Sequence, residues 1–430
     1  MSPQSAQTPM LLIFLLTIIA LIIEKYHMAV AAMIGAALTV LFGSFIYDIF
    51  TPQEAFSQFI DGPTLRLVLG ILLLMEGLAK SGLFQFIGLW VVKLVGSRPK
   101  ILFTAFMFLT AILTTSIPNL PAMLIIGAIT ASIAKSLKLK LRTWILYEAI
   151  ACNAGSIGLM ISSIPNLILA SEFGFTFSQF MRITLPLSML IVLVTTLFGL
   201  KTADLTEEGE EEVDISSLNP WQAVKNKGIL VRSTIIFLST ITLFFLHERI
   251  GVPLDFVALC GAVIMLWIGV TEPEDLFRSV NWGVFFFLAS FYITLGAMEK
   301  TGALDFLARI VAPLYRKRPI ISLSATLWIS GIASGLIDNI PVTLTLLPLM
   351  KKAAQTSQIP LTRLAWATGI GANVGGSLTY FASPPSVVAI SILEKEDPDF
   401  SPSDFMRVGV PITFIQLMVA NVYLLLWPFF

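Results

Sequence analysis

The chain has 430 residues, of which 56% are hydrophobic and only 13% are charged. This composition leaves too little polar surface for a soluble protein of this length. Its 27 basic and 27 acidic side chains cancel, which removes the electrostatic basis for binding nucleic acid. The two cysteines, Cys152 and Cys260, lie in apolar runs and argue against a disulfide framework or a cysteine metal cluster. The composition therefore predicts a protein whose solvent is the lipid bilayer, with no metal centre and no nucleic acid partner.

Apolar runs that are long enough, or nearly long enough, to cross a bilayer follow one another along the chain. The first run has no basic residue before it, which indicates a retained membrane helix and not a cleaved signal peptide. The predicted spans are residues 10–24, 28–47, 65–80, 180–200, 234–249, 253–270, 283–299 and 404–428. We therefore expect a multi-pass protein of the inner (plasma) membrane of the cell.

A different pattern lies between the third and fourth spans. Two apolar runs within residues 101–134 are joined by Ser-Ile-Pro-Asn-Leu-Pro, which is too short for an aqueous loop. This predicts a re-entrant hairpin whose tip stops at membrane depth. The next apolar segment, at about 143–171, is interrupted by Gly155, Gly158 and Pro165 and predicts a discontinuous helix. Irregular backbone at such depth is tolerated only where protein or a water-filled cavity surrounds it.

The second half of the chain repeats this pattern. Asn119 and Asn339 lie 220 positions apart, and so do Asn153 and Asn373. A second hairpin and a second discontinuous helix are predicted at about 320–354 and 363–393. Polar, helix-breaking residues that recur at one spacing within two apolar halves are typical of secondary transporters.

The domain organisation follows from this repeat. The sequence predicts an all-α polytopic membrane protein of two inverted repeats, residues 1–200 and 233–430. A hydrophilic acidic linker at 201–232 joins them, and we interpret it as a solvated connector.

Helices that begin or end inside the membrane present unpaired N–H or C=O groups, which attract anions or cations respectively. Amide and hydroxyl side chains near these ends can complete a binding site. A single serine there more often caps a helix end, but four asparagines at matched positions indicate function. The candidate substrate-binding residues are Ser116, Asn119, Asn153, Ser156, Ser163, Asn339, Thr343, Asn373, Ser377, Thr379 and Ser383.

Two acidic residues are candidates for coupling transport to a proton or a cation. Asp338 lies at the second hairpin tip, where the first half has Pro118, and an ionisable group at membrane depth marks a functional site. The alternative is a carboxylate that only caps the tip. Glu148 is the second candidate. Glu76 and Glu299 lie nearer to span ends and are interpreted as structural.

The segments Asp338-Asn339-Ile340-Pro341-Val342-Thr343 and Gly371-Ala372-Asn373-Val374-Gly375-Gly376-Ser377-Leu378-Thr379 resemble the ion transporter superfamily. The most similar branch contains ArsB-type arsenite permeases, NhaD-type sodium–proton antiporters and citrate or dicarboxylate carriers. The resemblance implies inverted repeats, hairpin tips that meet broken helices, and a transport domain that moves against a scaffold. It also implies a homodimer and, for an arsenite permease, a cytoplasmic ATPase subunit. The usual Thr-Pro-Ile-Gly element is replaced here by Thr379-Tyr380-Phe381-Ala382.

We therefore expect a secondary active transporter with no cofactor other than a coupling proton or sodium ion. Lys and Arg cluster at span ends, which favours a neutral, hydroxyl-rich cargo and thus proton-coupled efflux of arsenite or antimonite. A sodium–proton antiporter and an organic anion or dicarboxylate symporter are the alternatives. An enzyme is not expected, because His27 and His247 lie at span ends and no nucleophile is paired with a base.

Overall fold

The computed structural model describes residues 3–23, 25–96, 98–134, 137, 139–206, 219–224, 226–270, 272–315, 319–354, 359–397 and 399–426. These residues are helical, apart from turns and one antiparallel bridge between Leu139 and Thr206. Residues 207–218 of the predicted acidic linker lie outside the described residues.

Eight helices of the described residues are long and apolar enough to cross a membrane. They are α2 with its π-helical extension η2 (Met28–Ile46), α4 (Gly62–Lys80), α6 (Pro99–Ser116), α10 (Phe177–Thr202), α11 (Lys227–Ile250), α14 (Trp282–Lys300), α16 (Pro319–Leu336) and α20 (Pro402–Leu426). Two further predicted spans form shorter apolar helices, α1 (Gln7–Ile23) and α12 with η6 (Leu254–Gly269). The prediction of an all-helical multi-pass membrane protein is confirmed.

Each half also contains two helices over the region predicted as a hairpin and two short helices over the region predicted as a discontinuous helix. The second arms of the hairpins are α7 (Asn119–Ala134) and α17 (Asn339–Ala354). The broken helices are α8 (Leu141–Gly155) with α9 (Ile164–Phe173), and α18 (Leu361–Gly375) with α19 (Pro384–Glu396).

The helices of the two halves correspond in order and in length. From α4 to α8, each helix of the first half begins and ends 220 residues before its counterpart in the series α14 to α18. The packing is reciprocal as well, because α2 packs against α14 while α12 packs against α4. This reciprocity indicates an approximate two-fold relation between the halves; their opposite orientation in a membrane stays a prediction.

Two short helices, α5 (Leu83–Val95) and α15 (Ala303–Tyr315), are absent from the predicted spans. Each has 13 residues, which is too short to cross a bilayer at 1.5 Å per residue. They follow α4 and α14 and contact the hairpin helices α7 and α17 respectively. They therefore connect the long spans to the hairpins.

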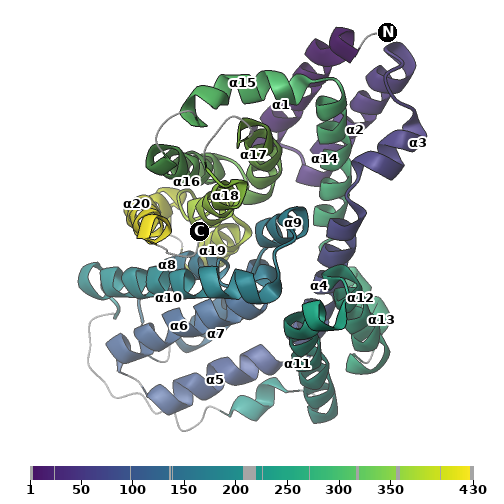
Figure 1. Ribbon diagram of the computed structural model, residues 1–430. Helices are drawn as coiled ribbons and strands as arrows, with labels where there is room; N and C mark the ends of the chain where they lie inside the picture. The colour runs from purple at the N-terminus through teal and green to yellow at the C-terminus, as the bar shows by residue number, and fades with distance from the viewer. Residues whose placement is uncertain are drawn as a thin grey trace.

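The described helices form two groups (Figure 1). One group, which we call the scaffold, is a column of helices on the right of the picture. It contains α1, α2, α4, α11, α12, α14 and the short helix α13 (Pro273–Ser279). The other contains both hairpins, both broken helices, α10 and α20, and we call it the hairpin group. Within the hairpin group, α9 contacts the scaffold helix α4 as well as α17 and α18. The site described next lies where the two groups meet.

Candidate functional site

The two hairpin tips break the helix by different means. In the first tip, Ile117 has an extended backbone (φ −134°, ψ 159°), because a residue before proline is disfavoured in the helical region. In the second tip, where Asp338 replaces Pro118, a carboxylate oxygen of Asp338 accepts a hydrogen bond of 2.9 Å from the backbone N–H of Ile340. This bond caps the start of α17. Asp338 thus caps the tip, which is the structural role considered in the sequence analysis as the alternative to ion coupling.

Both broken helices restart deep inside the protein. The hydroxyl of Ser163 caps α9 by accepting from the backbone N–H of Asn166, and Pro165 occupies the first turn, where a missing N–H costs nothing. Helix α19 likewise starts with Pro384 and Pro385 after Ser383. Since Ser163 and Ser383 are both buried, the N-terminal ends of two helix dipoles lie within the protein interior.

The broken helices pack very closely on the first arms of the hairpins. A Cβ atom added to Gly155 would collide with Ala111 and Thr114 of α6, and one added to Gly375 would collide with Gly331 of α16. The two glycines are 220 residues apart and make the equivalent close approach in each half. Glycine is needed at both positions because there is no room for a side chain.

A buried network of neutral side chains joins the two broken helices across the halves. Asn153 donates to Ser383 Oγ at 2.9 Å and to Ser377 Oγ at 3.2 Å. In the reciprocal direction, Asn373 donates to Asn166 Oδ1 at 2.8 Å. All five side chains are almost fully buried.

This network holds several of the predicted substrate-binding residues. Ser156 belongs to it as well, since its hydroxyl donates to the backbone oxygen of Asn153 at 2.7 Å and contacts Asn373 Oδ1 at 3.4 Å. Both N–H groups of the Asn153 amide are already used. The residues of this network therefore connect the two halves and support the site from behind. Asn166 and Ser386 were not predicted, although the prolines that precede them mark both positions.

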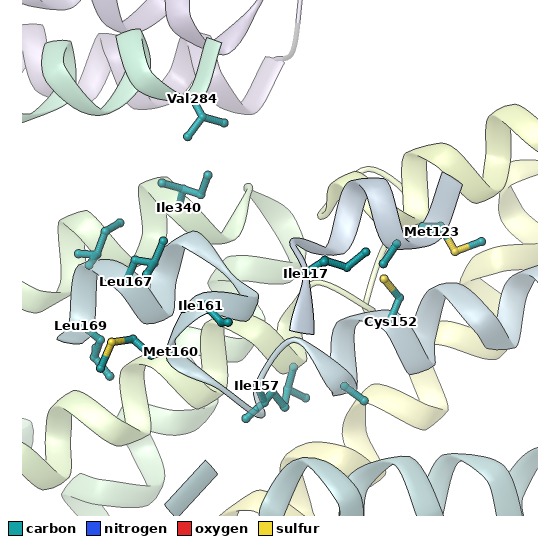
Figure 2. Packing of buried hydrophobic residues seen from close by; sticks show 14 of the residues in the cluster. Ile117, Met123, Cys152, Ile157, Met160, Ile161, Leu167, Leu169, Val284 and Ile340 are labelled. Atoms are coloured by element: carbon teal, nitrogen blue, oxygen red, sulfur yellow. The ribbon is translucent and has the colours of Figure 1, made fainter. Parts of the chain in front are cut away.

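A cavity of about 140 Å³ lies in front of this network, between the hairpin group and the scaffold. Its hairpin-group wall is formed by both tips and by the first residues of α9 and α19. Its scaffold wall includes Leu72, Met75 and Glu76 of α4, Ser279 at the end of α13, and Val284 of α14. Figure 2 shows Val284 opposite Ile340 of the second tip.

Four of the predicted site residues line this cavity: Asn119, Ser163, Asp338 and Asn339. Asn339 is only 4% exposed, yet its side-chain amide makes no hydrogen bond with the described residues. It is therefore available to a ligand in the cavity.

Three other predicted residues bond to nearby backbone and do not line the cavity. Ser116 donates to the oxygen of Ile112 at 3.0 Å, and Thr343 donates to that of Asn339 at 2.8 Å. Thr379 donates to the oxygen of Gly335 at 2.7 Å and so ties the end of the broken helix to the hairpin. These contacts are those expected of hydroxyls that satisfy helix ends.

Glu148 lies behind the cavity and does not line it. Its side chain is fully buried, and Oε1 accepts from Thr130 at 2.5 Å, while Oε2 has no partner among the described residues. One turn further along α8, the thiol of Cys152 donates to the backbone oxygen of Asn119 at 3.2 Å. Helix α8 thus carries Glu148 and, through Cys152, contacts the first hairpin tip.

Glu76 is the cavity residue that the sequence analysis assigned to a structural role. Its position near the end of α4 suggested a side chain directed towards the membrane surface. A comparison of the two halves could have identified Glu76 as a candidate site residue, because its counterpart is Gly296. Like Asp338, it is an acid that occurs in one half only.

A larger open cavity of about 880 Å³ lies on the other side of α9. It separates the start of α4 and the end of α14 from α9 and α17, and we call it the vestibule. Its acidic lining residues are Glu54, Asp61, Glu172 and Glu299. Glu54 pairs with Lys300 and Glu172 pairs with Lys351. Among the described residues, no group of three or more His, Cys, Asp or Glu side chains is arranged to hold a metal ion.

Comparison with known proteins identifies the family. The profile of a family described as citrate transporters, CitMHS, matches residues 18–371, which is most of the chain. The chain belongs to the citrate transporter family. The resemblance to the superfamily that includes citrate carriers is thereby confirmed, and so is the prediction of a membrane transporter.

Relatives of this citrate transporter family member extend over nearly its whole length. An uncharacterized transporter of Mycobacterium tuberculosis is 29% identical over 399 residues, which cover 92% of this chain and 91% of the relative. The "46 kDa membrane protein" of Mycobacterium leprae is 26% identical and covers 96% of each chain. The mouse P protein is 24% identical over 94% of this chain and 58% of its own length. None of these names mentions arsenite or antimonite.

The fold also matches a solved structure. The crystal structure of the YdaH transporter of Alcanivorax borkumensis, described as having an unusual topology, superposes with a TM-score of 0.62. The match covers 97% of this chain and 98% of YdaH at 12% sequence identity. At this identity the similarity concerns the fold alone.

Proposed function

We propose that this member of the citrate transporter family is a secondary active transporter of a small carboxylate anion. It would work by alternating access in the plasma membrane and use a proton or sodium ion as the coupling ion. The observation that carries the proposal is the convergence of two hairpin tips and two helix starts on one cavity of about 140 Å³. Helix N-termini favour anions, and their meeting at a cavity between repeats is typical of carriers of anionic substrates.

The side chains of the cavity fit a carboxylate. Asn119 and Asn339 bring amide groups from the two tips, and Ser163 brings a hydroxyl from the start of α9. Amide N–H groups and hydroxyls donate to carboxylate oxygens without adding a fixed charge. The description of the family as citrate transporters also supports an organic anion. Asp338, at the second tip, is the residue that we assign to the coupling ion.

Efflux of arsenite or antimonite is the second candidate function. It is favoured by one observation, that no Lys or Arg is among the described residues that line the cavity. A neutral, hydroxyl-bearing cargo needs only amides, hydroxyls and one acid. Under this alternative, a cytoplasmic ATPase subunit is a further expected partner. Sodium–proton antiport is a third alternative, in which Asp338 and neighbouring oxygens bind only ions.

Transport by purified protein in liposomes tests these functions directly. We expect uptake of labelled citrate or of a dicarboxylate when a proton or sodium gradient is imposed, and none in protein-free liposomes. Arsenite flux under a proton gradient without carboxylate flux would favour the second candidate. Sodium–proton exchange without either cargo would favour the third. Light scattering of the detergent-solubilised protein would test the homodimer.

A further inference from the structure

The central cavity is lined by a carboxylate from each side. Glu76 belongs to the scaffold helix α4, and Asp338 belongs to the second hairpin tip. Each occurs only once in the repeat, because the counterpart of Glu76 is Gly296 and that of Asp338 is Pro118. Neither acid has an acidic counterpart in the other half.

The neighbours of Glu76 differ between the halves in a complementary way. Ser279 of α13 lines the same cavity as Glu76, and its hydroxyl donates to the backbone oxygens of Asp275 at 2.9 Å and Leu276 at 3.0 Å. The counterpart of Ser279 in the first half is Phe59, whose ring packs so closely on Gly296 that an added Cβ would collide with it. Glu76 and its neighbour Ser279 at one end of the scaffold thus correspond to Gly296 and the ring of Phe59 at the other end. This difference places a carboxylate at the Glu76 position of the central cavity and none at the equivalent position of α14, Gly296, which lines the vestibule.

The side-chain amide of Asn339 lines the cavity beside the two carboxylates. The amide of Asn339 is buried, adjoins Asp338 in sequence and makes no hydrogen bond with the described residues. Its side-chain oxygen, the two carboxylates and the hydroxyl of Ser279 are oxygen ligands of the kind that hold a proton or a small monovalent cation. An amide without a protein partner at the wall of a cavity can bind a ligand there.

One other charge near α4 acts on Glu76. Lys80, one turn beyond it, donates to the backbone oxygen of Asp275 on α13 and lies close enough to attract the carboxylate of Glu76. At the opposite end of α4, Arg66 pairs with Asp255 of α12 at 2.8 Å. The charged residues that α9 and α14 contribute nearby, Glu172, Glu299 and Lys300, line the vestibule. Those of α13, Glu274, Asp275 and Arg278, have exposed side chains.

The geometry points to a shared cation site in which Glu76 of the scaffold and Asp338 of the hairpin tip together hold the coupling ion. This inference rests on the proposed function and names the second residue of its coupling site. A proton or a sodium ion bound by both carboxylates links the hairpin group to the scaffold. Because Glu76 lies on the scaffold and Asp338 on the hairpin tip, the link forms only in a state of the carrier that places the tip beside Glu76.

Direct ion binding to the purified full-length protein tests the site without knowledge of the cargo. One arm measures binding of radioactive sodium, and the other measures the infrared band of a protonated carboxyl group that appears on acidification. The variants are Glu76→Gln, Asp338→Asn and their double variant. Glu274→Gln, on the exposed surface of α13, is the matched control, and melting temperatures verify folding. Glu76→Asp tests rescue by a shorter acid.

We expect Glu76→Gln to weaken sodium binding at least tenfold, or to remove the carboxyl band, while Glu274→Gln leaves both readouts unchanged. The double variant is expected to lose no more than either single variant, because the two acids share one ion. Unchanged ion binding in Glu76→Gln, additive losses in the double variant, or a wild-type protein that binds neither ion overturns the inference. Ion binding without any citrate flux would instead count against the proposed cargo and leave the ion site supported.

Discussion

The side-chain amide of Asn153 donates a hydrogen bond of 2.9 Å to the hydroxyl of Ser383, although 230 residues separate them. The bond joins the end of α8 in the first half to the start of α19 in the second. Since both side chains are buried, the bond fixes how the two broken helices meet. It also explains why a residue that resembles a substrate ligand in the sequence has a supporting role behind the cavity.

Replacing Asn153 should therefore affect stability. In Asn153→Ala, the hydroxyls of Ser377 and Ser383 lose a buried donor, at a cost of about 1–3 kcal/mol. We expect a clear drop in melting temperature of the purified protein. Asn119→Ala is the matched comparison, because the Asn119 side chain makes no hydrogen bond with the described residues. It should leave the melting temperature nearly unchanged and reduce transport; equal destabilisation by both changes would contradict this assignment.

Asp338→Asn should abolish ion-coupled transport without unfolding the protein. Asparagine retains the oxygen that accepts from the backbone N–H of Ile340, so the cap of α17 is preserved. It cannot bind a proton or neutralise a cation, so flux driven by an ion gradient should fall to the level of empty liposomes. Asp399→Asn, on the exposed surface, serves as the control. Full coupled flux in Asp338→Asn would defeat the coupling role.

The two equivalent glycines should be equally intolerant of a side chain. In Gly155→Ala and Gly375→Ala, the added methyl group meets the backbone of α6 or α16, and overpacking of this kind costs about 1–3 kcal/mol. Both variants should melt at lower temperature and show reduced transport. At Gly228, near the start of α11, an added methyl group meets only the side chain of Asn226, so Gly228→Ala should be tolerated. Tolerance at Gly155 or Gly375 would show that the close approach is not maintained.

An ion pair that links the halves predicts a pH dependence of stability. Arg142 of α8 pairs with Asp397, after α19, at 2.8 Å, and this hydrogen-bonded pairing lowers the pKa of Asp397. Because the folded-state pKa lies below the unfolded value of about 3.9, the contribution is present above that pH and is lost as pH falls through the folded pKa. Arg142→Gln should lower the melting temperature at pH 7 and have little effect in strong acid.

The control for this pH dependence is Arg98→Gln, since Arg98 is exposed and forms no ion pair with the described residues. Melting curves of both variants from neutral to acidic pH provide the measurement. A difference between wild type and Arg142→Gln that stays constant across this range would rule out the ion pair as its cause.

The sequence by itself determined the class of the protein, the repeat and the positions of the helix breaks. These properties are local, because the length of an apolar run sets a span and Pro118, Pro165 and Gly155 interrupt a helix wherever it packs. The same reasoning missed α5 and α15, since short helices between long spans give no membrane-length signal.

Only the tertiary structure decided which polar side chains face the cavity. Asn119 and Asn153 look alike in the sequence, yet one lines the cavity and the other bonds across the halves. Glu76 looked structural until α4 was placed opposite Asp338. The physical reason is that the partner of a buried polar group is supplied by helices far away in the chain, and their packing, not local pattern, sets which groups meet.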